Sequence, residues 1–166
     1  MDSAKVSDWM QVVGIFSLVA SLVFVGLQMQ QDRQIALAGQ YQDRSAVAVE
    51  LWNGIAQSEY DIRLLGNAAV TNPWWTKTFG DSMSPREAGA AIISARRSFA
   101  VLDNHHYQYE LDFYDEETWQ SFHGHLLDFL SRNPVARAMV RNQPEIFRPT
   151  FLAVCEQIVD ALDQSE

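Results

Sequence analysis

Residues 9–31 read WMQVVGIFSLVASLVFVGLQMQQ, a stretch that contains no Asp, Glu, Lys or Arg. Between Val12 and Leu27 the polar side chains are limited to Ser17 and Ser21. A helix over residues 9–31 is about 34 Å long at roughly 1.5 Å per residue, which is enough to cross the ~30 Å hydrocarbon core of a bilayer. We therefore predict a transmembrane helix over residues 9–31, preceded by a short tail over residues 1–8.

Two other interpretations of this segment remain open. The apolar run Val12–Leu27 is slightly shorter than the usual spanning length, so a buried core helix also fits it. Lys5 ahead of an apolar run is typical of a signal peptide, but no small-x-small cleavage pattern follows the run. An uncleaved anchor is the interpretation that the sequence favours.

The orientation of the predicted anchor depends on few charges. Lys5 and the amino terminus precede the segment, and Arg33 and Arg44 follow it. Because positively charged flanks remain on the cytoplasmic side, this balance places residues 32–166 in the cytoplasm. The predicted location is the bacterial inner membrane, with a single crossing and a cytoplasmic carboxy-terminal domain.

Small residues gather on one face of the predicted membrane helix. Gly14, Ser17 and Ser21 lie at helical spacing, and the two serines form a small-xxx-small pair. Such a face allows a second helix to approach closely. The expected partners are therefore the lipid bilayer and either another copy of the chain or another membrane protein.

Composition limits the kinds of partner. The 166-residue chain carries 12 Lys and Arg against 21 Asp and Glu, a net charge of −9. This acidic balance excludes a nucleic-acid partner, because phosphate binding requires a basic surface. The single cysteine, Cys155, excludes an intrachain disulfide and a cysteine-rich metal site. We predict no cofactor.

Residues 32–166 have the pattern of one all-α domain. The polar continuation after Gln31 lacks proline as far as Ala56, so the membrane helix is expected to run on into the domain. Ser84-Pro85-Arg86-Glu87 has the composition of a capping box and predicts a helix start. Thr71-Asn72-Pro73 is interpreted as a helix break, and Trp74, Trp75 and Phe79 are assigned to the loop that follows. The other predicted helices cover residues 58–69, 85–111 and 116–131, with a short one from Pro134 and a last one that ends near Leu162, giving a bundle of about five helices.

The histidines and acids of residues 103–125 support one metal-site hypothesis. Asp103, His106 and Glu110 lie at i, i+3 and i+7, which places them on one stripe of a helix. His123 completes a set of four if the next helix folds back antiparallel, and such groups can hold a divalent metal. A membrane-anchored metal-dependent hydrolase or metal sensor is therefore an alternative function. Structural hydrogen bonding of these side chains is the simpler interpretation.

A third hypothesis is a domain that binds a small apolar ligand between its helices, suggested by the aromatic residues Trp74, Trp75, Trp119 and Phe122. The sequence contains no Gly-x-Ser-x-Gly, Gly-x-Gly-x-x-Gly or Gly-Lys-Ser/Thr motif. We therefore assign no catalytic residue, and the sequence favours a protein that is not an enzyme.

Several features occur together in a known order. A helix opens at Trp9 and ends in FVGLQ at residues 24–28, and Tyr107-x-Tyr109, Glu116-Glu117 with Trp119, and Phe147-x-Pro149-x-Phe151 follow. In this the chain resembles an uncharacterised group of bacterial proteins, common in marine proteobacteria. It departs from them at Asp103-Asn104, where they often have Glu-Asn, and at Phe113-Tyr114, where they have a glycine.

The resemblance implies an inner-membrane protein with one amino-terminal membrane helix and a cytoplasmic helical domain. It implies no activity. The leading functional hypothesis is thus a structural or accessory protein, a scaffold that associates with itself or belongs to a membrane complex.

Overall fold

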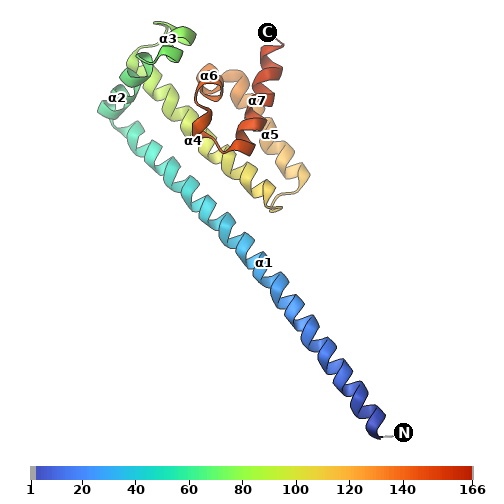
Figure 1. Ribbon diagram of the computed structural model, residues 1–166. Coiled ribbons are helices and arrows are strands. Elements are labelled where there is room, and N and C mark those ends of the chain that lie inside the picture. Colours follow the sequence, from blue (N-terminus) through green and yellow to red (C-terminus); the bar gives the residue numbers. More distant parts are fainter. Residues whose placement is uncertain (1–2, 166) are drawn as a thin grey trace. The chain divides into compact units, whose positions relative to one another are not determined.

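The computed structural model describes residues 3–165, and the side chains from Trp9 on. These residues form an all-α structure without a strand, which confirms the predicted fold class (Figure 1). Residues 1–2 of the predicted tail and residue 166 of the predicted domain lie outside the described residues. The helices are α1 (Ser3–Gln57), α2 (Glu59–Val70), α3 (Pro73–Phe79), α4 (Pro85–Glu110), α5 (Glu116–Arg132), α6 (Pro134–Asn142), the 3₁₀ helix η1 (Pro144–Ile146) and α7 (Pro149–Asp163).

The chain divides into two compact units, Met1–Gln40 and Tyr41–Glu166. Helix α1 is unbroken from Ser3 to Gln57 and so contributes to both units. This continuity confirms that the long apolar helix leads into the helical bundle without a loop between them. The absence of proline from α1 explains it, because each residue can donate its backbone N–H to the preceding turn.

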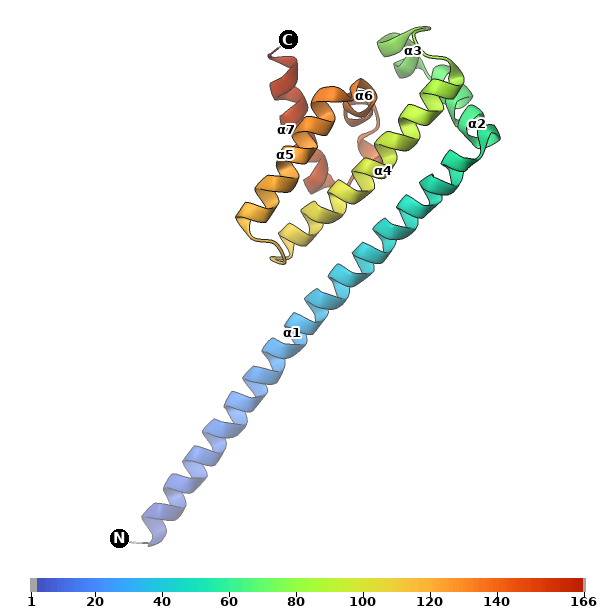
Figure 2. The ribbon, with the colours of Figure 1, turned by 180° about the vertical axis from the view of Figure 1, so that it is seen from behind.

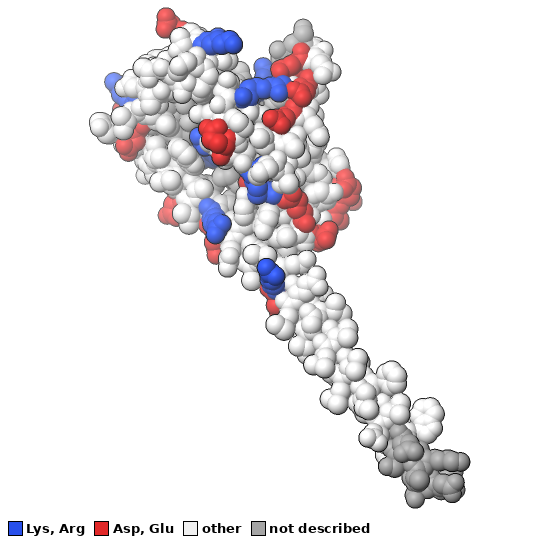
Figure 3. Space-filling view, in the orientation of Figure 1, with Lys and Arg blue, Asp and Glu red and all other residues white. Residues whose placement is uncertain are grey.

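Within the first unit, residues 9–31 present an apolar, uncharged surface. From Trp9 on, α1 is long and apolar enough to cross a membrane, and none of its most apolar window is buried. Leu18, Leu22 and Phe24 are each more than 60% exposed. Figure 3 shows this stretch of the helix as uncharged, whereas acidic and basic side chains are scattered over the bundle.

In the second unit, the last turns of α1 lie antiparallel to α4, as Figures 1 and 2 both show. The hydroxyl of Tyr41 donates a hydrogen bond to the Asp103 carboxylate, and the hydroxyl of Ser45 donates to the carbonyl oxygen of Ala100 at 2.8 Å. Farther along α1, the side chain of Arg97 donates to Asn53 Oδ1 at 2.9 Å. Polar contacts thus connect α1 to the bundle along this line.

Helices α2 and α4 pack against each other through two glycines. A Cβ atom at Gly66 would lie 1.5 Å from the carbonyl oxygen of Pro85, and a Cβ at Gly89 would lie 2.0 Å from that of Ile62. Both obstacles are backbone atoms, so neither can move aside as a side chain would. The close approach of these two helices therefore requires glycine at both positions.

The helix starts follow the expected capping chemistry. Ser84 and Glu87 form the predicted capping box, with the Ser84 side chain accepting from the Glu87 N–H and the Glu87 carboxylate accepting from the Ser84 N–H at 2.8 Å. Asp115 caps α5 by accepting from the N–H of Thr118 at 2.8 Å. Asn133 caps α6, which places Pro134 at a position that needs no N–H donor.

The assignment of Trp74, Trp75 and Phe79 to a loop was wrong, because these residues belong to α3. The Asn72 side chain accepts a hydrogen bond from the N–H of Trp74, and Pro73 occupies the first helical position. The Asn-Pro pair, which was interpreted as a helix break, is therefore also a helix start.

The bundle encloses one apolar core. Phe99 of α4 packs edge to face against Phe129 of α5, at 5.3 Å between ring centroids, and against Phe147, at 4.8 Å. Trp75 and Phe151 are fully buried, so α3 and α7 both supply large side chains to the interior. The core includes side chains from α2 to α7, and its rigid helices position the polar cluster described next.

Candidate functional site

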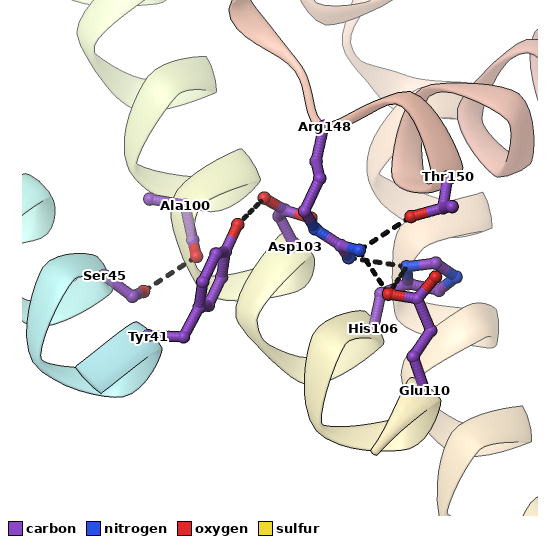
Figure 4. Close-up of polar contacts among 8 residues, drawn as sticks. All are labelled: Tyr41, Ser45, Ala100, Asp103, His106, Glu110, Arg148 and Thr150. Atoms are coloured by element: carbon purple, nitrogen blue, oxygen red, sulfur yellow. Dashed lines mark hydrogen bonds and ion pairs between the residues drawn. The ribbon is translucent and has the colours of Figure 1, made fainter. Parts of the chain in front are cut away.

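Three titratable side chains of α4 point toward the same arginine, Arg148 (Figure 4). Asp103, His106 and Glu110 lie on the same stripe of the helix, as their spacing predicted, and Figure 4 shows their side chains directed toward Arg148. His106 is buried, and the side chains of Asp103 and Glu110 are 17% and 29% exposed. The charged groups are thus largely withdrawn from water.

Arg148 enters this group from the start of α7. It is the N-cap residue of that helix, with φ −67° and ψ 135°, and Pro149 follows it. A residue before proline favours this extended conformation. The Arg148 side chain makes no cap hydrogen bond, and instead it extends across to α4.

The guanidinium of Arg148 contacts each of the three α4 side chains. Its Nε lies 3.1 Å and its Nη2 3.0 Å from Oδ1 of Asp103, and Nη2 also lies 2.9 Å from Nδ1 of His106. Its Nη1 donates to the Glu110 carboxylate and, at 2.6 Å, to the hydroxyl of Thr150. We call Tyr41, Asp103, His106, Glu110, Arg148 and Thr150 the Arg148 cluster.

Two tyrosine rings complete the surroundings of the guanidinium. The Cζ atom of Arg148 lies 5.0 Å from the ring centroid of Tyr107 and 5.7 Å from that of Tyr41, within cation–π range. The two rings are tilted against each other with centroids 4.2 Å apart. Because Tyr41 belongs to α1, the cluster joins α1, α4 and α7.

The hydrogen bonds define the protonation states. Arginine only donates, so Nδ1 of His106 must accept from Arg148 and the imidazole is neutral, with its proton on Nε2. Burial agrees with this, since it lowers the pKa of His106, and the charge of Arg148 lowers it further against the opposing Glu110 and Asp103 carboxylates. Burial and the neighbouring Asp103 raise the pKa of Tyr41 to about 12, so the phenol remains a donor.

Arg148 stays charged. Burial disfavours its guanidinium cation, but the Asp103 and Glu110 carboxylates outweigh that effect and raise its pKa. One cation is thereby shared between two carboxylates and a neutral imidazole. This arrangement holds α1, α4 and α7 together through charge-assisted hydrogen bonds, which are stronger than hydrogen bonds between neutral groups.

The structure groups Arg148, rather than His123, with the other three members of the predicted metal set. His123 lies on α5 with its ring edge-on to Trp119, at 5.9 Å between centroids. Among the residues whose side chains are described, no three His, Cys, Asp or Glu side chains are arranged to hold a metal ion. Sequence reasoning missed Arg148 and Tyr41, which come from 38 residues after Glu110 and 62 residues before Asp103.

The aromatic residues considered for ligand binding pack against one another. Trp75 is fully buried, and its ring centroid lies 5.5 Å from that of Trp74. Trp119 stacks on Tyr109 at 5.1 Å, and Phe122 stacks on His105 at 3.7 Å. These side chains therefore contribute to packing within the bundle.

The small face of α1 keeps its polar groups satisfied. The hydroxyl of Ser17 donates to the carbonyl oxygen of Val13, and that of Ser21 donates to the carbonyl oxygen of Ser17, both at 2.8 Å. A Cβ atom at Gly14 would meet nothing within 4 Å. This face is consequently open, and its serines need no partner outside the helix.

No protein-family model, curated protein or solved structure matches the chain. Its class is therefore defined by the structure alone, as an all-α protein with one long apolar helix at its amino terminus followed by a helical bundle.

Proposed function

We propose that the chain is a single-pass protein of the bacterial inner membrane, with residues 9–31 in the bilayer and the helical bundle in the cytoplasm. In this proposal it has no catalytic activity of its own. It acts as a structural or accessory component that associates with itself or with another membrane protein. The resemblance to membrane-anchored bacterial proteins and the positive charges of Arg33 and Arg44 support the orientation.

The observation that carries the proposal is the exposed apolar surface of α1. Residues 9–31 carry no charge, and the most apolar window of the helix is not buried at all. Burial of one Val, Leu, Ile or Phe side chain is worth about 1.5–3 kcal/mol, so leaving this many in water costs on the order of tens of kcal/mol. A bilayer removes that cost, and an unbroken helix satisfies all the backbone groups that lie within it.

The open small face supports the association step. Gly14, Ser17 and Ser21 provide a surface on which a second helix can pack closely, and the bonds of both serine hydroxyls within α1 lower the cost of placing them in lipid. Helix–helix packing of this kind depends on small side chains rather than on apolar burial. A larger side chain at Gly14 is then expected to separate the helices.

The structure also supports a firm attachment of the last turns of α1 to the rest of the bundle. Because α1 is one helix from Ser3 to Gln57, its last turns are part of the bundle and contact α4 through Tyr41, Ser45 and Asn53. The Arg148 cluster connects Tyr41 of α1 to α4 and α7.

Native mass spectrometry of the protein extracted from its own membranes tests the proposal. We expect a homo-oligomer or a defined complex with another membrane protein. The matched variants are Gly14→Leu and Gly26→Leu, because a Cβ atom at either glycine meets nothing within 4 Å, and at 100° per residue they lie on different faces of the helix.

Gly14→Leu should weaken association about tenfold or more, whereas Gly26→Leu should leave it unchanged. A monodisperse wild-type monomer without a partner would overturn the scaffold proposal. A monomer that carries one divalent ion would instead favour the metal hypothesis built on Asp103, His106, Glu110 and His123.

A further inference from the structure

A cavity of about 180 Å³ lies in the bundle on one side of the contact between α1 and α4. Trp52 of α1 and Arg96 of α4 line it, together with Ile146 and Phe147 from the segment that precedes α7. Phe99 and Asp103 of α4 also line the cavity. The cavity thus combines apolar and aromatic surface with a single cation.

Arg96 lacks the partners that a half-buried guanidinium normally has. Its Nε is buried without a hydrogen bond, and its Nη2 reaches Oε1 of Gln143 only at 3.4 Å. Glu145 lies close enough to favour the charge but forms no ion pair, and burial lowers the pKa of Arg96. Arg141 and Arg148, by contrast, contact carboxylates directly. A buried donor without a partner is costly, so an anion is favoured here.

The walls of the cavity favour a flat apolar body next to that anion. The Cζ atom of Arg96 lies 5.8 Å from the ring centroid of Trp52. Phe99 and Phe147 meet edge to face, at 4.8 Å between centroids. Rings arranged in this way contact another aromatic ring favourably in either a stacked or an edge-on geometry.

Asp103 in the wall does not cancel the charge of Arg96. One oxygen of its carboxylate accepts from Arg148 and the other from Tyr41, so its charge is compensated within the Arg148 cluster. The positive end of the cavity is therefore the Arg96 end. A ligand with one negative group would place that group at Arg96 and its apolar part toward Phe99 and Phe147.

We propose that this cavity binds a small carboxylate that carries one aromatic ring. The carboxylate would accept from the guanidinium of Arg96, which offers pairs of parallel N–H donors. A volume of about 180 Å³ is below the roughly 300 Å³ of drug-sized sites and limits the ligand to one ring. This inference is independent of the scaffold proposal.

Occupancy of the cavity would strengthen one contact of the bundle. Trp52 of α1 and Arg96 of α4 both line the cavity, so a bound ring would contact both helices. Ligand binding would then add to the attachment that Tyr41 and Ser45 already provide.

Titration of the full chain in a non-ionic detergent with benzoate tests the proposal, with benzamide as the uncharged analogue of the same shape. We expect saturable benzoate binding with a Kd of about 1 mM or below, a shift of the Arg96 Nε–H resonance, and no such shift with benzamide. Titration of protein-free micelles corrects for partitioning. Equal binding of benzamide, or no saturation by about 20 mM benzoate, would overturn the proposal.

The matched variants are Arg96→Gln and Arg97→Gln. Arg97 is the next residue of α4, hydrogen bonds to Asn53 and does not line this cavity. Arg96→Gln should weaken benzoate binding about tenfold or more, and Arg97→Gln should change it less than about twofold. Unchanged binding to Arg96→Gln contradicts the assignment. If that variant does not fold, the wild-type Nε–H resonance decides, because only a ligand at Arg96 shifts it selectively.

Discussion

The hydroxyl of Tyr41 donates a hydrogen bond to one oxygen of the Asp103 carboxylate, whose other oxygen lies 3.1 Å from Nε of Arg148. One carboxylate of α4 thus connects the end of the long helix α1 with the start of α7 (Figure 4). The stability of the bundle and the position of α1 on it should therefore depend on this carboxylate and its two donors.

The Tyr41→Phe variant removes one donor and leaves the ring in place. We expect the free energy of unfolding of the bundle to fall by about 1–2 kcal/mol, because an oxygen of Asp103 loses a charge-assisted hydrogen bond. Urea unfolding followed by tryptophan fluorescence measures this. Tyr60→Phe is the matched control, since Tyr60 is 74% exposed. Equal effects of the two variants would show that the Tyr41 hydroxyl contributes nothing.

Arg148→Met should have a larger effect. The variant leaves the Asp103 and Glu110 carboxylates, 17% and 29% exposed, without their shared cation, and breaking a largely buried pair of this kind costs about 3–5 kcal/mol. Arg148→Lys should recover only part of the loss, because an ammonium group cannot reproduce the fork of donors. Arg132→Met, at an ion pair with 79% exposure of the arginine, should change unfolding by less than about 1 kcal/mol. A loss at Arg148 no larger than at Arg132 contradicts the assigned role.

Stability should fall as the pH is lowered from about 7.5 to 5.5. The pKa of His106 is lowered in the folded state, chiefly by burial, so below its unfolded value of about 6.5 the unfolded chain binds more protons than the folded chain does. Protonation also places a second cation against Arg148. Burial lowers the pKa of His105 as well, so part of the effect belongs to that residue.

The His106→Gln variant separates the two histidines. Its amide oxygen can still accept from Arg148, but it does not titrate. Unfolding measured at both pH values should show a smaller loss for His106→Gln than for the wild type. The same loss in both proteins would assign the whole pH effect to groups other than His106.

Gly66→Ala should destabilise the bundle by about 2 kcal/mol or more, because the new Cβ would lie 1.5 Å from the carbonyl oxygen of Pro85 and the two helices would have to separate. Gly124→Ala is the control, since a Cβ atom there meets nothing within 4 Å. That substitution in the middle of α5 should stabilise by about 0.5–1 kcal/mol. Thermal unfolding followed by circular dichroism shows whether each variant lowers or raises the stability of the bundle. Stabilisation by both substitutions would contradict the close contact of α2 with α4.

Local signals in the sequence were sufficient for most of the fold. The capping box at Ser84 and Glu87 and the cap at Asp115 each depend on residues within one helical turn, so their spacing predicts them directly. The pair Asn72-Pro73 was ambiguous, because proline both ends one helix and suits the first position of the next. Its interpretation as a break alone is what hid α3.

The candidate site was only half predictable. The stripe of Asp103, His106 and Glu110 follows from helical spacing, but the cation at its centre comes from the loop before α7 and depends on how the bundle folds. The position of Arg148 before Pro149 indicates an extended residue at a helix start. Nothing in the local sequence indicates which side chains Arg148 contacts.

Cysteine accessibility in bacterial cells tests the membrane anchor most directly. The native Cys155 is fully buried, and burial raises the pKa of its thiol, so it should not react in the folded protein. Single cysteines at Val19, Gln42 and Ser165 then report their own surroundings to a membrane-impermeant maleimide. We expect Val19→Cys to stay unlabelled even in opened membranes, and Gln42→Cys and Ser165→Cys to react only after the inner membrane is permeabilised. Rapid labelling of Val19→Cys in the native protein, or recovery of the chain in the soluble fraction, would contradict the account.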